Sequence, residues 1–127
     1  MAFAHSDVLD NGPAYIKANA VEVLLVSAYT PGDTYATVQG NKVGKATISS
    51  ADFSLASSGT ARKLTFAGKA GAASATVAAG NDLQFVFTDG ASKVLWAAQE
   101  TSNMAVTSGN PLTFPVLGYT ANQPTDA

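Results

Sequence analysis

The stretch DLQFVFTDGASKVLWAAQ, residues 82–99, carries the clearest structural pattern in the chain. Leu83, Phe85 and Phe87 alternate with smaller or polar residues, so in an extended strand these three side chains share one face. An Asp-Gly pair at 89–90 favours a tight reversal, and a second apolar run follows it. The stretch therefore predicts a β-hairpin that buries one face.

Short β-prone runs also fill the rest of the chain after residue 20, separated by Gly, Asn, Asp, Ser and Pro. The run VEVLLVSA at 21–28 is apolar on both faces apart from Glu22, which indicates a central strand covered on both sides. A turn with Pro followed by Gly comes next, at 30–33. Further strand candidates are 42–48, 52–55, 62–68, 74–78 and 111–117. This spacing predicts a mainly β fold, an antiparallel sandwich or barrel-like domain.

For two of these strand candidates, the sequence also predicts which face is buried or where in the sheet the strand lies. In 62–68, Leu64 and Phe66 fall on one face and the intervening residues fall on the other. In 111–117, two prolines each remove a backbone donor, and such a strand belongs at the edge of a sheet.

Residues 6–19 carry the only helical signals that we find. Ser6 is suited to cap the start of a helix, an Asn-Gly pair at 11–12 is suited to end a first turn, and Pro13 is suited to begin a second short piece. At the other end, residues 118–127 are small and polar, so we expect a tail that is mobile or orders only against a partner. The expected organisation is one domain over 1–127, with a flexible arm at 1–5, a short helical segment at 6–19, a β domain at 21–117 and a C-terminal tail at 118–127.

Composition excludes several classes of protein. The 127 residues include 13% charged side chains with a net charge of −2, so the chain lacks the basic footprint of a nucleic-acid-binding protein. There is no cysteine, which excludes disulfides and thiolate metal sites. The N-terminus lacks the pattern of a secretion signal, and the longest apolar run is too short to span a bilayer. We therefore expect synthesis in the cytosol and no membrane partner.

The titratable residues suggest no catalytic, metal-binding or cofactor site. His5 is the one histidine, and we interpret it as an exposed terminal residue. Among the carboxylates, Asp82 and Asp89 lie seven residues apart, about 23 Å along a strand, which is too far for one glycosidase-like site. Asp33 and Asp52 lack the spacing of a calcium loop, and we interpret them as turn formers. The expected protein is not an enzyme.

Basic and aromatic side chains offer the remaining candidates for partner contacts. The one basic cluster consists of Arg62, Lys63 and Lys69. We interpret it as a solvated strand face rather than as a site for an acidic partner. Trp96 stands beside an apolar neighbour in a predicted strand and is interpreted as core. The pair Tyr29 and Tyr35 is an open candidate for a glycan platform or a protein contact.

The order of these features resembles that of small virion structural proteins of tailed bacteriophages. The resemblance covers nearly the whole chain, although each motif alone is weak. Its motifs are SDVLDNGPAYIKANA leading into VEVLLVSA, then YTPGDTYAT, SSADFSL, GTARKLTFAGKAG, DLQFVFTDGASKVLWAAQ and VTSGNPLTFPVLGY.

The resemblance implies a non-enzymatic structural subunit with no catalytic, cofactor or metal residues. The leading expectation is a capsid decoration (cement) protein that binds the outer surface of the major capsid protein lattice and stabilises the head. Two alternatives stay open: a tail, neck or fibre component, and a host-surface glycan-binding module.

The same resemblance implies the partners and the location. The expected partners are the major capsid protein and neighbouring copies of this chain, in a trimer or another cyclic homo-oligomer. The expected location is the virion, after synthesis in the host bacterial cytoplasm. We expect residues 1–5 and 118–127 to contribute contacts, whereas the sequence assigns no individual partner-binding residue.

Overall fold

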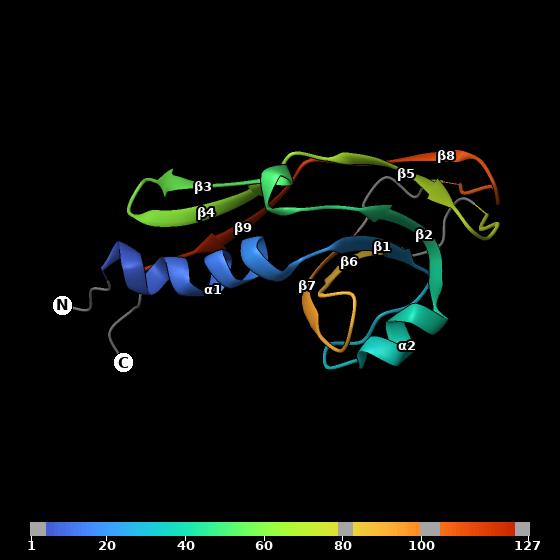
Figure 1. The fold of residues 1–127 in the computed structure, drawn as a ribbon, viewed down its shortest axis with the longest axis horizontal. Helices are drawn as coiled ribbons and strands as arrows, with labels where there is room; N and C mark the ends of the chain where they lie inside the picture. Colours follow the sequence, from blue (N-terminus) through green and yellow to red (C-terminus); the bar gives the residue numbers. More distant parts are fainter. Residues whose placement is uncertain (1–4, 79–82, 100–104, 124–127) are drawn as a thin grey trace.

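The computed structural model describes residues 5–78, 83–99 and 105–123, with the side chains of residues 6–9 outside the described part. It is mainly β, with two antiparallel sheets in a sandwich-like arrangement and a helix at the N-terminal side (Figure 1). The elements, in chain order, are α1 (Ser6–Asn19), β1 (Glu22–Val26), α2 (Tyr35–Gly40), β2 (Lys42–Thr47), a 3-10 turn (Ser50–Asp52), β3 (Phe53–Ser58), β4 (Ala61–Phe66), β5 (Lys69–Ala73), β6 (Gln84–Thr88), β7 (Val94–Gln99), β8 (Pro111–Phe114) and β9 (Leu117–Ala121).

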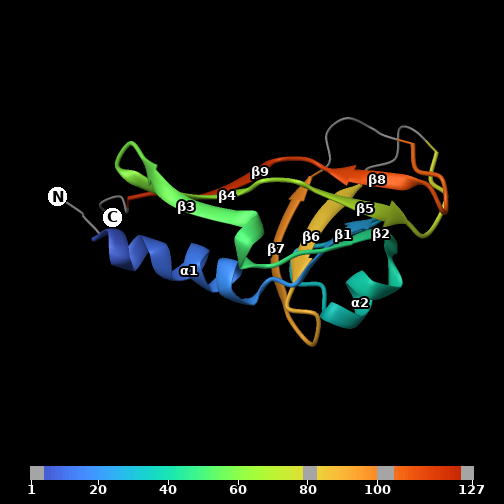
Figure 2. The ribbon, with the colours of Figure 1, turned by 45° about the horizontal axis from the view of Figure 1, so that its top comes forward.

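The larger sheet has six strands in the order β7-β6-β1-β2-β5-β8, and every neighbouring pair is antiparallel. The predicted hairpin is confirmed as β6 and β7, and all five residues of β1 are buried in the middle of the sheet, as predicted. The sheet curls strongly (Figure 2). As a result, the rings of Phe85 in β6 and Phe114 in β8, four strands apart, have centroids 5.7 Å from each other.

The smaller sheet, β3-β4-β9, is joined to the larger one by a continuous ribbon of two long chain segments. Phe66 lies opposite Leu117 in the smaller sheet and Lys69 lies opposite Phe114 in the larger one, so both pairings share one register. Pairing is interrupted between them because Pro115 has no N–H to donate.

The structure therefore divides the predicted strand 111–117 into β8 and the start of β9. β8 does lie at the edge of its sheet, as the prolines predict. Opposite the break, Gly68 has φ of 87°, and a Cβ atom added there would lie 2.8 Å from the carbonyl oxygen of Phe114. This close approach at a positive φ requires glycine.

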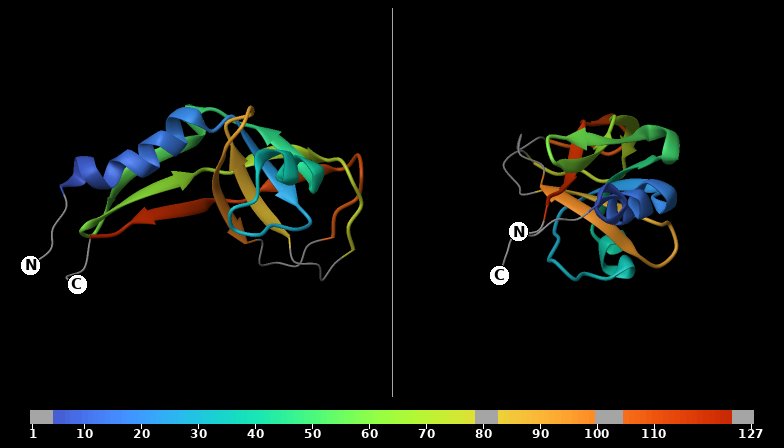
Figure 3. Two further views of the ribbon diagram at one scale, coloured as in Figure 1. Left: turned by 90° about the horizontal axis from the view of Figure 1, so that it is seen from below. Right: turned by 90° about the vertical axis from the view of Figure 1, so that its left-hand side faces the viewer.

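Helix α1 runs unbroken through Pro13, so the prediction of two short pieces separated by the Asn-Gly pair at 11–12 is wrong. The helix lies along β3, β4 and β9 (Figure 3). This packing stabilises the parts of α1 before and after Pro13 as one helix. Pro13 and Ile16 are buried on the packed side. The predicted capping role of Ser6 concerns a side chain outside the described part.

The expected C-terminal tail at 118–127 is also wrong for its first residues. Leu117–Ala121 forms β9, which pairs with β4 along its whole length. Leu117 and Tyr119 lie opposite Phe66 and Leu64, and their alternation is the strand signal that the small polar neighbours obscured. Residues 124–127, like the arm at 1–4, lie outside the described residues.

Two further elements differ from the sequence-based expectation. α2 lies between the turn predicted at 30–33 and the strand candidate at 42–48, where no helix was predicted, and Thr34 caps it by accepting a hydrogen bond from the amide N–H of Thr37 at 3.2 Å. β5 was expected five residues later, at 74–78, where the described residues show only a single bridge between Val77 and Val106. The Ala- and Gly-rich β5 has little strand propensity of its own and is held by β2 and β8 on its two sides.

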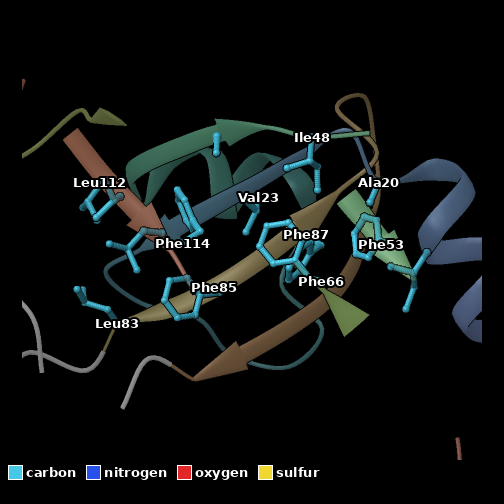
Figure 4. Packing of buried hydrophobic residues seen from close by; sticks show 14 of the residues in the cluster. Ala20, Val23, Ile48, Phe53, Phe66, Leu83, Phe85, Phe87, Leu112 and Phe114 are labelled. Atoms are coloured by element: carbon cyan, nitrogen blue, oxygen red, sulfur yellow. The ribbon is translucent and has the colours of Figure 1, made fainter. Parts of the chain in front are cut away.

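The core consists of two clusters on opposite faces of β1. The smaller cluster contains Leu24, Val26, Val38 and Val86 and is covered by α2. The larger cluster joins the two sheets through phenylalanine rings (Figure 4). The Phe66 ring lies 5.6 Å from that of Phe53 and 5.1 Å from that of Phe87, measured between centroids. The predicted buried face of Leu64 and Phe66 is confirmed.

Candidate interaction surface

The basic cluster predicted from the sequence is divided among separate contacts. Arg62 binds Asp10 of α1, with Nε 2.6 Å from Oδ1 and Nη2 3.3 Å from Oδ2, and so fastens the helix to β4. Lys69 pairs with Asp52 at 3.2 Å. The described residues give Lys63 no carboxylate partner, and its side chain lies against Gly118. Two of the three basic residues in this cluster therefore form ion pairs within the fold.

Glu22 is buried, with 5% of its surface exposed, and four elements meet at its carboxylate. Its Oε1 atom accepts hydrogen bonds from the Thr88 hydroxyl at 2.6 Å and from the Gln39 amide at 2.7 Å, while Oε2 lies 3.3 Å from Nζ of Lys45. The Thr88 oxygen accepts in turn from the amide N–H of Gly90 at 3.1 Å. This network fixes α2 and the β6–β7 turn to β1, which is a structural use of the acid.

The remaining described aspartates organise turns. Asp33 accepts the amide N–H of Thr30 at 2.8 Å, and Asp52 accepts that of Ser49 at 2.9 Å, so both are turn formers as predicted. Asp89 directs one oxygen, Oδ1, into the β6–β7 turn. The other residue of the excluded pair, Asp82, lies outside the described residues, and His5 is exposed.

In the β6–β7 turn, Oδ1 of Asp89 accepts three backbone N–H groups, those of Ser92 at 2.8 Å, Lys93 at 2.9 Å and Ala91 at 3.0 Å. These hydrogen bonds, led by that of Ser92, hold the pKa of Asp89 below its ordinary value of 3.8. The charged carboxylate of Asp89 therefore stabilises its own turn through Oδ1.

We expect Asp89→Asn to lower stability at neutral pH, because the neutral amide accepts the three N–H groups less strongly. Since the folded pKa of Asp89 is lowered, its contribution is complete above the unfolded value and is lost as the pH falls through the folded pKa. Urea unfolding of both chains from pH 7 downward measures this. The difference in unfolding free energy should shrink below about pH 4, and a difference that stays constant down to pH 2 would contradict the assignment.

In the described ranges 5–78, 83–99 and 105–123, no three His, Cys, Asp or Glu residues come together as metal ligands. Among the helices described there, none has the length and apolar character to cross a membrane.

The aromatic candidates fall into two groups. Trp96 is partly buried against the larger cluster, stacked on Phe87 with a centroid distance of 4.6 Å, and its edge contacts Tyr119. This confirms its place in the core. Tyr29 and Tyr35 are both partly buried, and Tyr29 packs against the smaller cluster. Their candidacy for a glycan platform or a protein contact stays a prediction, with only part of each side chain accessible.

A different set of side chains forms the most distinctive surface feature. Tyr15 of α1 is 45% exposed and Val21, between α1 and β1, is 44% exposed. Both border the β6–β7 turn: Nζ of Lys93 lies 3.1 Å from the Tyr15 hydroxyl oxygen, and a Cβ atom added to Gly90 would meet the Val21 side chain. We call Tyr15, Val21 and Lys93 the Tyr15 patch.

Nζ of Lys93 lies at the hydroxyl end of the Tyr15 side chain, 3.1 Å from the hydroxyl oxygen and 5.6 Å from the ring centroid. The hydrogen bond to Tyr15 is the main reason that the pKa of Lys93 is raised above its ordinary value of 10.5. Sequence reasoning missed this patch because Tyr15 and Lys93 are 78 positions apart. The available signal was a tyrosine on an otherwise small and polar helix face.

The sequence and the fold were compared with protein families, curated proteins and solved structures. No protein-family model, no curated protein sequence and no solved structure matches the chain.

Proposed function

We propose that this chain is a non-enzymatic virion structural protein, a capsid decoration (cement) protein that binds the outer surface of the major capsid protein lattice and stabilises the head. The order of motifs from SDVLDNGPAYIKANA to VTSGNPLTFPVLGY, which resembles that of small structural proteins of tailed phages, is the basis of the proposal.

The observation that carries the proposal furthest is the two-stranded ribbon that spans both sheets. Residues 62–66 pair with 117–121 and residues 69–72 pair with 111–114 in one register, and α1 is fastened to the ribbon by Asp10 and Arg62. The product is an elongated body (Figure 1) in which the described carboxylates serve internal contacts. Such a body suits a subunit that bridges two neighbouring proteins rather than one that transforms a substrate.

Stabilisation of the lattice follows from the thermodynamics of binding. A protein that binds the assembled lattice but not the separated subunits lowers the free energy of the assembly. Contact with many equivalent sites lets a modest affinity per copy suffice when neighbouring copies also touch one another. In the proposed virion, the partners are the major capsid protein and further copies of this chain, in a trimer or another cyclic arrangement.

The termini also bear on this proposal. The first turns of α1 and the end of β9 lie at the same end of the body, since Arg62 contacts Asp10 and pairs with Ala121. The expected contacts of residues 118–123 therefore fall at the same end of the body as the start of α1.

The test is the copy number of this chain relative to the major capsid protein, measured by quantitative mass spectrometry on purified virions. A decoration protein is expected at near-stoichiometric abundance. A small number of copies would instead favour the tail, neck or fibre alternative, and absence from the particle would overturn the virion proposal. Binding of host-surface saccharides in a calorimetric titration would then favour the glycan-binding module.

A further inference from the structure

We propose that the Tyr15 patch is the surface through which the protein docks on the capsid lattice, and that it takes a carboxylate side chain of the lattice protein with an apolar group beside it. This inference rests on the proposed function and names the contact chemistry of that function. It is based on the observation that hydrogen-bond donors of Lys93 and Tyr15 lie beside exposed apolar surface of Tyr15 and Val21.

The hydrogen bond between Lys93 and Tyr15 determines which of their donors remain available to a partner. The ammonium donates one hydrogen to the Tyr15 oxygen, at 3.1 Å, so two of its three hydrogens remain. Because that oxygen accepts, the hydroxyl hydrogen of Tyr15 is also left to donate. Three donors, one of them carrying a full positive charge, therefore point to a hydrogen-bond acceptor with negative charge, and a carboxylate matches this arrangement.

Asp89 stands in the same turn, near enough for its charge to attract that of Lys93, but no hydrogen bond or ion pair joins these two described side chains. Its Oδ1 atom is bound by three backbone N–H groups of the turn. Arg62, Lys45 and Lys69 are paired with carboxylates. Among the described residues, Lys93, like Lys63, has no carboxylate at ion-pair distance, and unlike Lys63 it lies beside the exposed side chains of Tyr15 and Val21.

The apolar part of the patch is fixed in place by the backbone. The amide N–H of Val21 donates to the carbonyl of Thr88 at 3.0 Å, and its own carbonyl accepts from Ile48 at 3.0 Å. A valine whose backbone is held in this way loses little backbone freedom on binding, and the Tyr15 ring is held by its hydrogen bond to Lys93. Tyrosines in such positions are frequent hot spots of protein interfaces.

The experiment uses particles of the encoding phage from which this gene has been deleted. Purified wild-type chain and single variants are added back, and bound protein is measured against free concentration at several salt concentrations. Lys93→Ala is expected to weaken binding about tenfold and to reduce its dependence on salt. Tyr15→Phe should weaken binding less, and Lys93→Arg should retain most of it.

Two matched controls test whether the position matters. Lys63→Ala removes an exposed lysine outside the Tyr15 patch and is the control for Lys93→Ala. Val116→Ala removes exposed apolar surface outside the patch and is the control for Val21→Ala. Both controls should bind as the wild type does, and unfolding curves verify that every variant is folded. Wild-type binding that is unchanged by Lys93→Ala and Tyr15→Phe would overturn the docking inference alone. Failure of the wild type to bind would overturn the decoration proposal together with it.

Discussion

Replacement of Phe66 by alanine is expected to lower the free energy of unfolding by about 3–5 kcal/mol. Phe66 is fully buried, and its ring contacts those of Phe53 and Phe87 at the junction of the two sheets. Removing it leaves a cavity between layers that cannot close without moving a sheet. Since a domain of this size is stabilised by about 5–15 kcal/mol, this change takes away a large part of the total.

The measurement is urea unfolding followed by the fluorescence of Trp96, the one tryptophan in the chain. Trp96 stacks on Phe87, which touches Phe66, so its emission reports on the junction. Val116→Ala serves as the control, because Val116 is 64% exposed and its loss should change stability by less than about 0.5 kcal/mol. Equal effects of the two substitutions would mean that the rings do not join the sheets.

Replacement of Glu22 by leucine is expected to lower the free energy of unfolding by about 2–4 kcal/mol. The leucine fills the space but leaves the hydroxyl hydrogen of Thr88, a residue with 0% exposure, without the acceptor it had at 2.6 Å. The amide of Gln39 loses its 2.7 Å acceptor as well. An unsatisfied buried donor costs more than the hydrogen bond contributed.

The double variant Glu22→Leu/Thr88→Val separates the network from simple packing. Replacing both partners by apolar groups removes the unsatisfied hydroxyl, whereas Gln39 stays without its acceptor and the amide of Gly90 loses the Thr88 oxygen, so part of the loss should be recovered. The readout is a double-mutant cycle of unfolding free energies. Additive effects of the two substitutions would show that Glu22 and Thr88 are not coupled, contrary to the hydrogen bond between them.

Much of the β structure could be predicted because its signal is local. Leu83, Phe85 and Phe87 alternate within one strand, and the Asp-Gly pair at 89–90 follows directly, so no distant residue is needed to recognise the hairpin. The buried strand β1 was recognisable for the same reason. The prolines at 111 and 115 predicted an edge strand through their missing N–H groups alone.

The candidate surface had no such local signal. Tyr15 and Val21 each look like an ordinary residue of a short helix or strand start, and Lys93 like a turn lysine. Their chemistry arises only when α1 lies beside the β6–β7 turn. The partners of Glu22 were equally hidden, since Thr88 is 66 positions away.

The sequence by itself determined the mainly β class, the hairpin at 82–99, the central strand and the buried face of Leu64 and Phe66. These features depend on a two-residue period and on turn chemistry, both of which act between close neighbours.

Only the tertiary structure decided that α1 continues through Pro13, that the supposed tail forms β9 and that the Ala- and Gly-rich β5 is a strand. Each of these segments is weak alone and becomes stable when a distant partner covers it or pairs with it. Packing and hydrogen bonding across the fold outweigh local propensities, which are worth about 1 kcal/mol per residue or less in general and about 3 kcal/mol for a proline inside a helix.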